Sequence, residues 1–373
     1  MTEILQELSS NAIKVQQALA ELAAERQIRR DLEVRVQRIE AESARNIETP
    51  TVQSQRDKPL HVELEALRPF IDLQTDPRQL FMDMTLVWDN KHEKVYSARR
   101  GARVFAVKIA PVHVEAQGTT DGKSMSPSPK IAMLKHELLY IGPMHNQHIC
   151  SIQRIYLSGG EAEPSLWIES EFMGYSLAKL AWLLVDLHQY HRLSQFPIRE
   201  QVVARFTADA LAALTYLQKI GIAHRDIRGN NLLLNKDGIV KLVNFGHAAK
   251  RYKQEALMCR DIVGRTYWQA AEMHQGPYDA MKVDVWSLGA TAWELFDSES
   301  SIGTATTFRE RWPRNEIFRK PSQGLHDFLV ACSEVPTRRL SAEELSKTPW
   351  IGSACSRSEI IDLMRSLQQW TDG

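Results

Sequence analysis

Hydrophobic residues recur along the first 45 positions with the spacing of a coiled-coil heptad. With Met1 at position a, nine of the twelve a and d positions as far as Ile39 are apolar, and the segment contains neither proline nor glycine. Asn11, at a d position, would fix the register of paired helices. We therefore predict a long helix over residues 1–45 that forms a coiled coil with another chain. The alternative is a single amphipathic helix docked on its own domain.

The heptad pattern stops at residue 46, where a polar segment rich in Gln, Ser and Pro begins. Because such a segment buries little apolar surface, we predict a linker over residues 46–75. A second polar segment, residues 115–130, contains two Ser-Pro pairs and predicts a flexible loop inside otherwise regular structure. Phosphorylation of these pairs is one interpretation, and ordinary loop composition is the simpler one.

Between residues 76 and 351, strand-like and helix-like patterns follow one another in a distinctive order. Strand-like segments extend to Ile109, a helix-like segment covers residues 131–141, strand-like sequence continues to Phe172, and mostly helical patterns follow. This order predicts an α+β domain in which a small sheet lobe precedes a helical lobe. In residues 352–373, apolar side chains at helical spacing predict a final amphipathic helix, which we expect to pack on the helical lobe rather than on a partner.

Composition and charge narrow the class of protein. The chain has 373 residues, of which 46 are basic and 46 acidic, so its formal charge is zero. This balance argues against nucleic acid or an anionic membrane as partner. The 4 cysteines lie far apart without a C-x-x-C pair, which argues against a zinc site or a disulfide framework. Since the chain shows neither a long apolar run nor a signal-peptide pattern, we expect a cytoplasmic protein, with the nucleus as the alternative.

Short motifs in the α+β region carry the candidate chemistry. Residues 224–231 read His-Arg-Asp-Ile-Arg-Gly-Asn-Asn, which places Asn231 five residues after Asp226 and before an apolar run. A strand-like segment ends at Lys108, and Glu137 follows on the next predicted helix. A strand that ends in lysine is weak evidence by itself, because edge strands often carry lysine. Together and in this order, the two motifs match the phosphate-binding lysine and the catalytic loop of protein kinases.

Three further segments carry the same resemblance. Residues 263–272 read Val-Gly-Arg-Thr-Tyr-Trp-Gln-Ala-Ala-Glu, residues 282–289 read Lys-Val-Asp-Val-Trp-Ser-Leu-Gly, and residues 338–345 read Arg-Arg-Leu-Ser-Ala-Glu-Glu-Leu. They are similar to the family's V-G-T-P-Y-W-M-A-P-E, K-V-D-I-W-S-L-G and closing segment. The region therefore resembles a eukaryotic protein kinase of the PAK-type branch of serine/threonine kinases. This resemblance implies the bilobal protein-kinase fold, with a β-rich N-lobe and a helical C-lobe.

The resemblance assigns catalytic and nucleotide-binding roles to matching positions. Asp226 would accept the proton of a substrate hydroxyl, with Arg225 beside it, and Lys108 would hold the nucleotide phosphates while paired with Glu137. Lys108 would contact the phosphates, Val95 and Ala106 would form the roof of the adenine site, and Leu233 would form its floor. The hinge residues Glu171 and Met173 would offer backbone groups to the adenine edge.

Structural roles follow from the same resemblance. Ser170 would be the gatekeeper residue beside the adenine site, and Asp284 would brace the catalytic loop from the helical lobe. Arg339 would pair with Glu272 as a buried ion pair. Removal of either partner would leave a buried charge unpaired, which is strongly destabilising.

Two departures from the family pattern fall where nucleotide chemistry would take place. The family's Asp-Phe-Gly is here Asn-Phe-Gly, so the amide of Asn244 replaces the metal-binding carboxylate and leaves Asn231 as the other metal-ligand position. Trp88, Asn90 and Glu93 occupy the three positions of the glycine-rich loop, where side chains obstruct the approach of backbone N–H groups to phosphates. The resemblance thus implies ATP as the cofactor and magnesium held more weakly than in the family.

Three more substitutions concern the protein substrate and the activation segment. Arg228 stands where serine/threonine kinases have Lys, and Arg265 stands where PAK-type kinases have a Thr that contacts the catalytic aspartate. We therefore expect Arg265 to fill the substrate channel and to pair with Asp226. Asp261 occupies the position of the activating phosphothreonine, where its carboxylate would hold the segment near Arg225. An ordinary loop acid is an equally good interpretation of Asp261.

Three functional hypotheses follow. In the first, the protein is a pseudokinase that acts as a scaffold or regulator in signalling, and residues 1–45 set its homo- or hetero-oligomeric state with protein partners. In the second, it is an ATP-dependent serine/threonine protein kinase of low activity, and in the third it binds nucleotide without transfer. The lost carboxylate and glycine loop favour the first hypothesis, and the retained Lys108, Glu137 and Asp226 favour the other two.

Overall fold

The computed structural model separates the chain into two units, Met1–Leu60 and His61–Gly373, and the described residues lie in the second. The described ranges are 62–89, 94–112, 129–141, 144–159, 164–191, 198–251, 256–297 and 320–371. The predicted coiled coil, the greater part of the predicted linker, and most of the 115–130 loop lie outside these ranges, as do Asn90 and Glu93.

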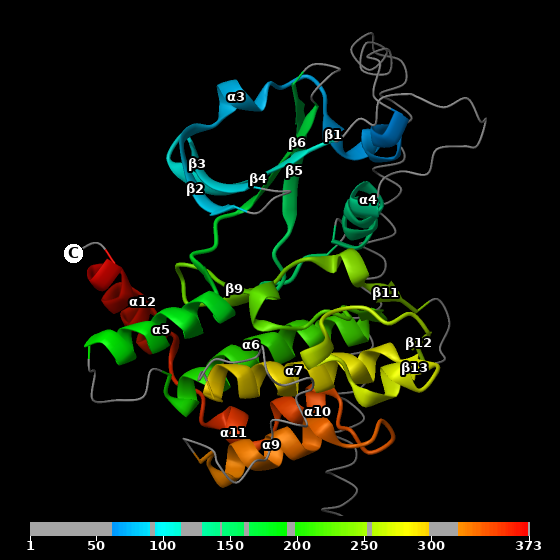
Figure 1. The fold of residues 1–373 in the computed structure, drawn as a ribbon, viewed down its shortest axis with the longest axis vertical. Coiled ribbons are helices and arrows are strands. Elements are labelled where there is room, and N and C mark those ends of the chain that lie inside the picture. Colours follow the sequence, from blue (N-terminus) through cyan, green and yellow to red (C-terminus); the bar gives the residue numbers. More distant parts are fainter. Residues whose placement is uncertain are drawn as a thin grey trace, which may run out of the picture. The chain divides into compact units, whose positions relative to one another are not determined.

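The N-terminal lobe is built on a six-stranded sheet with the strand order β1-β5-β6-β4-β3-β2 (Figure 1). Neighbouring strands are antiparallel except for β1 and β5, which run parallel. Two helices, α3 and α4, belong to the same lobe. The bounds of these elements are β1 (Ile71–Asp72), α3 (Pro77–Leu80), β2 (Met82–Asp89), β3 (Lys94–Arg100), β4 (Arg103–Pro111), α4 (Pro129–Ile141), β5 (Ile152–Ser158) and β6 (Ser165–Glu171).

An aromatic cluster and a buried ion pair hold the strands of this sheet together. The ring centroid of Phe81 lies 5.9 Å from that of Tyr156 and 6.4 Å from that of Trp167. The fully buried carboxylate of Glu169 accepts a hydrogen bond of 2.7 Å from the Tyr156 hydroxyl and pairs with Arg100 at 2.7 Å. Because a buried carboxylate is costly without such partners, these contacts tie β3, β5 and β6 together.

The sheet lobe begins earlier in the chain than the polar pattern indicated. The 3₁₀ helix η2 (Val62–Phe70) and strand β1 lie within the range predicted as linker, residues 46–75. Leu64 and Leu67 are fully buried, and η2 contacts α4. The linker therefore does not extend over residues 62–72, because the folded lobe offers an apolar surface on which these leucines pack.

The C-terminal lobe is mostly helical (Figure 1). Its helices are α5 (Leu177–His191), α6 (Glu200–Lys219), α7 (Ala280–Asp297), α9 (Gln323–Ser333), α10 (Ala342–Ser346), α11 (Pro349–Gly352) and α12 (Arg357–Thr371). Its short strands, which pair as β10-β9-β7, β11-β8 and β12-β13, are β7 (Tyr175–Ser176), β8 (Ile222–Ala223), β9 (Leu232–Leu234), β10 (Val240–Leu242), β11 (Ala249–Lys250), β12 (Met258–Cys259) and β13 (Tyr278–Asp279). Four 3₁₀ turns complete the described part: η3 (Gly229–Asn231), η4 (Phe245–His247), η5 (Thr266–Trp268) and η6 (Ala271–His274).

Helix α7 lies at the centre of the helical lobe and is buried over most of its length. It contacts α6 on one side and α9 on another. A Cβ atom at Gly289 would lie only 2.6 Å from Cβ of Cys332, so glycine is what allows α9 to approach α7 this closely. A helix that is apolar on all sides forms the core of a lobe, and here it also carries Asp284 toward the catalytic loop.

The C-terminal helix α12 packs on the helical lobe through its apolar face. Ile360, Met364 and Leu367 are buried in the main hydrophobic core. At its first turn, Arg357 forms an ion pair of 2.9 Å with the buried Asp209 of α6. The α+β, bilobal fold predicted from the sequence is confirmed. Among the helices that the structure describes, none has the length and apolar character needed to cross a membrane.

Candidate functional site

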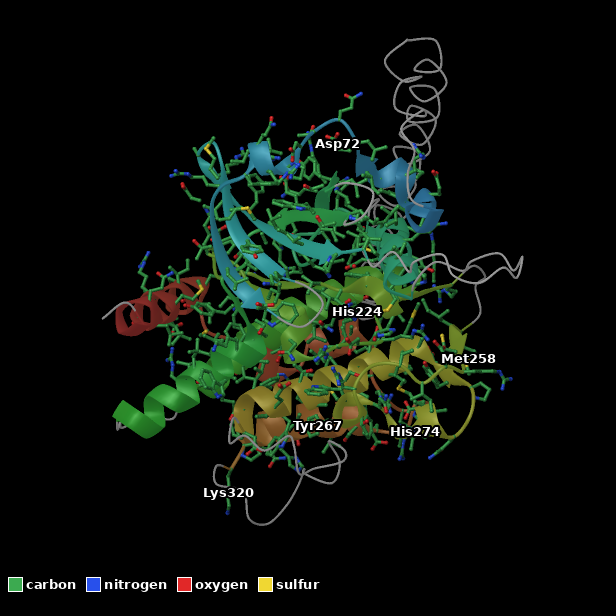
Figure 2. All side chains as sticks on the ribbon, turned by 45° about the horizontal axis from the view of Figure 1, so that its top comes forward. Asp72, His224, Met258, Tyr267, His274 and Lys320 are labelled. Atoms are coloured by element: carbon green, nitrogen blue, oxygen red, sulfur yellow. The ribbon has the colours of Figure 1, made fainter. Side chains whose placement is uncertain are left out.

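The His-Arg-Asp sequence lies in the loop between β8 and η3, where the two lobes meet (Figure 2). The carboxylate of Asp284 accepts hydrogen bonds from the backbone N–H groups of His224 and Arg225, both at 2.7 Å. Arg225 has a φ of 66°, a left-handed conformation that non-glycine residues adopt only when their surroundings impose it. The expectation that Asp284 braces the catalytic loop is confirmed.

The imidazole of His224 is a neutral part of this brace. Its Nε2 lies 2.9 Å from the carbonyl oxygen of Val243, and its Nδ1 accepts a hydrogen bond of 3.2 Å from the backbone N–H of Asp226. These two contacts require the proton on Nε2. Complete burial lowers the pKa of His224 to about 4, so the ring stays uncharged near neutral pH.

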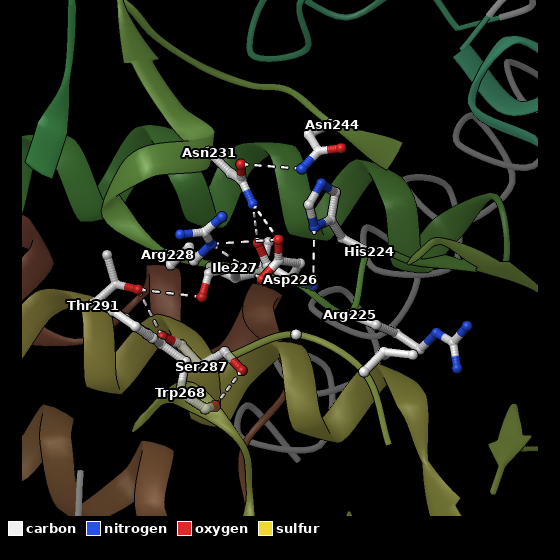
Figure 3. A network of polar contacts seen from close by, with 12 residues as sticks. His224, Arg225, Asp226, Ile227, Arg228, Asn231, Asn244, Trp268, Ser287 and Thr291 are labelled. Atoms are coloured by element: carbon white, nitrogen blue, oxygen red, sulfur yellow. Dashed lines mark hydrogen bonds and ion pairs between the residues drawn. The ribbon is translucent and has the colours of Figure 1, made fainter. Parts of the chain in front are cut away.

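One continuous polar network connects the catalytic loop to the Asn-Phe-Gly turn (Figure 3). Asn231 Nδ2 donates to the Asp226 carboxylate at 2.7 Å and to the Asp226 carbonyl at 2.8 Å. Asn244 Nδ2 donates to Asn231 Oδ1 at 3.3 Å. Arg228 Nε lies 3.2 Å from Asp226 Oδ1, and its hydrogen bond, at 3.4 Å, goes to Oδ2, the oxygen that Asn231 also contacts. The carboxylate of the candidate base therefore has two polar side-chain partners within the chain.

The Asn-Phe-Gly turn is packed between the lobes. Asn244 adopts a left-handed conformation with φ 68° and ψ 69°, and the ring of the fully buried Phe245 lies 4.7 Å from the His224 ring. The backbone N–H of Phe245 donates to Glu137 Oε1 at 3.1 Å. Helix α4 is thereby joined to the catalytic region of the helical lobe through Glu137, the predicted partner of Lys108.

The residues assigned to the nucleotide lie mainly on the sheet lobe. Lys108 of β4 is half-buried and lies directly opposite Val95 of β3, and Ala106 of β4 lies opposite Ser170 of β6. Leu233 belongs to β9 of the helical lobe. Lys108, the predicted phosphate-binding residue, and Val95, a predicted roof residue, are therefore cross-strand neighbours. Leu233, the predicted floor residue, lies on the other lobe.

The segment between the lobes is tied to the helical lobe by side chains. Glu171 ends β6, and Met173, two residues on, is buried. The Glu171 carboxylate forms an ion pair with Lys241 of β10 and accepts a hydrogen bond of 3.1 Å from Asn235. These contacts engage the Glu171 side chain, whereas the family resemblance had assigned only its backbone.

The activation segment is held to the catalytic loop by an ion pair. Arg225 Nη1 lies 2.6 Å from Asp261 Oδ1, and the Arg225 Nε group donates to the His247 carbonyl at 2.6 Å. The Tyr278 hydroxyl donates to the carbonyl of Asp261 at 2.6 Å. The hydrogen bond from the guanidinium lowers the pKa of the Asp261 carboxyl. The predicted contact between Asp261 and Arg225 is confirmed. This ion pair disfavours the alternative interpretation of Asp261 as an ordinary loop acid.

The predicted ion pair between Glu272 and Arg339 is also present. The distance from Arg339 Nη1 to Glu272 Oε1 is 2.6 Å, and the Arg339 side chain is 1% exposed. Arg339 also donates to the carbonyls of Lys282 and Glu334 at 2.8 and 3.0 Å. These contacts give the buried guanidinium of Arg339 its hydrogen-bond acceptors and hold η6 against the segment before α10.

Two features of the site differ from the sequence prediction or were missed by it. The basic partner of Asp226 is Arg228, whereas Arg265, which was expected to pair with it, is exposed.

Sequence reasoning also missed Glu294 of α7. Burial raises the pKa of Glu294 to about 7, and its Oε2 atom has no hydrogen-bond partner among the described residues. The available signal was a second acidic residue, besides Asp284, within a largely apolar helix.

Of the three substituted glycine positions, only that of Trp88 is described. Trp88 lies near the end of the edge strand β2, opposite Val95 of β3, and its side chain is 48% exposed. An indole therefore stands beside a residue assigned to the adenine roof, at a position where the family has no side chain.

A small sheet lobe, a helical lobe and a His-Arg-Asp loop at their junction define the bilobal fold of protein kinases. The family model described as "Protein kinase domain" matches residues 91–351, which is well over half of the chain. The chain belongs to the protein kinase family. Domains of this family in general bind ATP and magnesium and act on protein substrates.

Relatives of this chain include serine/threonine-protein kinases, several of them named as PAK proteins. The serine/threonine-protein kinase MST20 of Pyricularia oryzae is 26% identical over 79% of this chain and 30% of its own length. The serine/threonine-protein kinase PAK 5 of Rattus norvegicus is 31% identical over 62% of this chain and 31% of its length. For PAK 1 of Mus musculus, the identity is 27%, and the match covers 87% of this chain and 56% of that protein. The chain thus spans less than two thirds of the length of these relatives.

Proposed function

We propose that this protein is a pseudokinase, a kinase-fold protein of impaired phosphotransfer that acts as a scaffold or regulator in signalling. The observation that carries the proposal is the contact between the two residues at the metal-ligand positions. Asn244 supplies an N–H donor to Asn231 where the family has a carboxylate for magnesium. Since phosphoryl transfer depends on positioning and on neutralisation of phosphate charge, loss of this ligand acts directly on the reaction.

The residues of the site do not fit a magnesium ion of the usual kind. Magnesium prefers oxygen ligands in octahedral geometry and is typically held through carboxylates together with phosphates. Asn231 and Asn244 are both neutral, and the Nδ2 group of Asn244 points toward the oxygen that Asn231 would offer to the metal. Within the described ranges, no group of three or more His, Cys, Asp or Glu side chains is arranged to hold a metal ion.

The candidate base and the phosphate-loop position support the same proposal. The Asp226 carboxylate accepts hydrogen bonds from Asn231 and Arg228 at Oδ2, and Arg228 Nε also lies 3.2 Å from Oδ1, so a substrate hydroxyl would compete with these partners. Trp88 places a bulky side chain at the first glycine position of the phosphate loop. Both features reduce the chance that substrate and nucleotide adopt a reactive geometry.

The alternative function is an active, ATP-dependent serine/threonine protein kinase, and specific observations favour it. Lys108, Glu137 and Asp226 are retained, and the contacts of Asp284 with the catalytic loop and of Glu137 with Phe245 are formed. The relatives named above are serine/threonine-protein kinases. Binding of ATP as a structural ligand, without transfer, would use the same lysine.

A phosphotransfer assay on the full chain tests the proposal. We expect wild type to incorporate no more phosphate than Asp226→Ala, into itself or into a generic basic protein substrate, with magnesium or manganese. The Asp226→Ala variant removes the candidate base, so it sets the background for contaminating kinases. Transfer by wild type well above this background would contradict the pseudokinase proposal and support the active-kinase alternative.

A further inference from the structure

The orientation of the Asn231 amide is determined by its hydrogen bonds. Its Nδ2 group donates to the carbonyl and to the carboxylate of Asp226, at 2.8 and 2.7 Å, and both of these partners accept but cannot donate. The flipped amide would place its oxygen against two other oxygens. Asn231 Oδ1 therefore points away from Asp226, toward Asn244.

The orientation of the Asn244 amide follows from that of Asn231. The atom that faces Asn231 Oδ1 at 3.3 Å must be a donor, which is Nδ2 rather than Oδ1 of Asn244. Asn231 is 5% exposed, so little water is available to replace this contact. An aspartate at position 244 would be isosteric, yet it would bring a carboxylate oxygen to the Asn231 oxygen and a second negative charge toward Asp226.

The backbone at residue 244 supports the same choice of side chain. Its φ of 68° and ψ of 69° lie in the left-handed region, which Asn and Asp occupy more readily than other non-glycine residues. The next residue, Phe245, is fully buried and donates its N–H to Glu137 of α4. A bond that fixes Asn244 therefore also fixes the turn that reaches the sheet lobe.

We propose that the Asn244 amide takes the structural place of a divalent cation: its hydrogen bond to Asn231 joins the Asn-Phe-Gly turn to the catalytic loop, so the closed arrangement forms without metal. Asn244 is in this sense a positioning residue that acts through Asn231. The inference deepens the proposed function and rests on it, because an amide in this place stabilises the folded site while providing no charge for phosphate chemistry.

The test is thermal unfolding of the full chain in excess EDTA and in excess magnesium or manganese chloride, each with and without ATP. We expect the wild-type Tm to be the same with EDTA and with metal, whether or not ATP is present. In EDTA, Asn244→Asp should unfold about 2–4 °C below wild type, because an oxygen pair replaces a hydrogen bond. Metal, with or without ATP, should restore most of this loss in the variant alone.

Two further variants separate this role from general destabilisation. Asn230→Asp adds the same charge at the exposed residue beside Asn231, and we expect its Tm to be insensitive to metal. Asn244→Gly accepts the left-handed backbone without strain and removes the amide. It should unfold below wild type and show no metal response, and it keeps the test informative if Asn244→Asp cannot be purified.

Two results would overturn the inference. One is a wild-type Tm that rises with metal, with or without ATP, as much as that of Asn244→Asp. The other is a Tm of Asn244→Asp or Asn244→Gly in EDTA equal to that of wild type, since the hydrogen bond would then stabilise nothing. Neither result depends on phosphotransfer. If wild type is inactive but is stabilised by metal, the proposed role of Asn244 is refuted and the pseudokinase proposal stands. Phosphotransfer by wild type would instead refute the pseudokinase proposal.

Discussion

At the scale of single residues, burial decides the charge state of the groups that support the catalytic loop. His224 is fully buried with both ring nitrogens in hydrogen bonds that require a neutral imidazole. Asp284, also buried, accepts two backbone N–H bonds, and burial raises its pKa to about 7. The lowered pKa of His224 makes the folded state less stable as the pH falls, whereas the raised pKa of Asp284 makes it less stable as the pH rises.

The contribution of His224 can be isolated by mutation. The pKa of His224 is lowered from 6.5 to about 4 in the folded state, so its stabilising effect is complete above about pH 6.5 and is lost as the pH falls toward 4. In urea unfolding, wild type should lose roughly 2 kcal/mol more than His224→Gln between about pH 7 and pH 5. The difference between the two proteins removes the opposing effect of Asp284. Identical pH profiles would show that His224 is not the group responsible.

At the scale of elements, polar contacts supplement a small apolar contact of the activation segment, residues 256–263, whose Leu257, Cys259 and Val263 pack partly buried against the main core. Met258 and Ile262 are more than half exposed, while the Arg225–Asp261 ion pair and the β12–β13 pairing connect the segment to the rest of the lobe. The Arg225 side chain is 9% exposed and that of Asp261 is 58% exposed, so the pair is only partly screened by solvent. The Asp261 carboxylate, which is present without phosphorylation, therefore supplies one of the contacts that order this segment.

Removal of that carboxylate should loosen the segment locally. We expect backbone amides of residues 256–263 to exchange with deuterium about threefold to tenfold faster in Asp261→Ala than in wild type, with little change in α6 or α7. Arg260→Ala, at the exposed neighbouring position, is the matched control and should exchange like wild type. Unchanged exchange in Asp261→Ala would mean that β-pairing and Tyr278 hold the segment without the ion pair.

At the scale of the whole molecule, the N-terminal heptads predict assembly. Leu8 and Leu22 occupy a positions, and charged residues there would place two like charges in the seam of a paired helix. Light scattering should give wild type a mass at least twice that of the 42.6 kDa chain, and the Leu8→Asp, Leu22→Asp double variant should be a monomer. Aspartates at the outward positions Gln6 and Gln27 should leave the mass unchanged. A monomeric wild type would contradict the coiled coil and favour the docked helix.

The sequence was a good guide to those parts of the fold and site that depend on local pattern and on short motifs. The bilobal α+β order, the catalytic loop and the pairing of Glu272 with Arg339 could all be predicted. The packing of η2 and β1 could not, because residues 62–72 are ordered by contacts with α4 and β5 that are distant in the chain. Leu64 and Leu67 recur at a spacing that fits one face of a helix, but the segment is short and follows a polar stretch, so the local pattern does not show on which surface they pack.

The family, the order of the elements and the chemical identity of each group at the site can be read from the sequence, including the amide of Asn244 and the arginines near Asp226. The folded structure was needed to show that Arg228 rather than Arg265 contacts Asp226 and that the Asn244 amide faces Asn231. The physical reason is that a motif specifies which donors and acceptors are available. Which of them meet depends on backbone turns and side-chain rotamers, and buried neighbours from both lobes impose these.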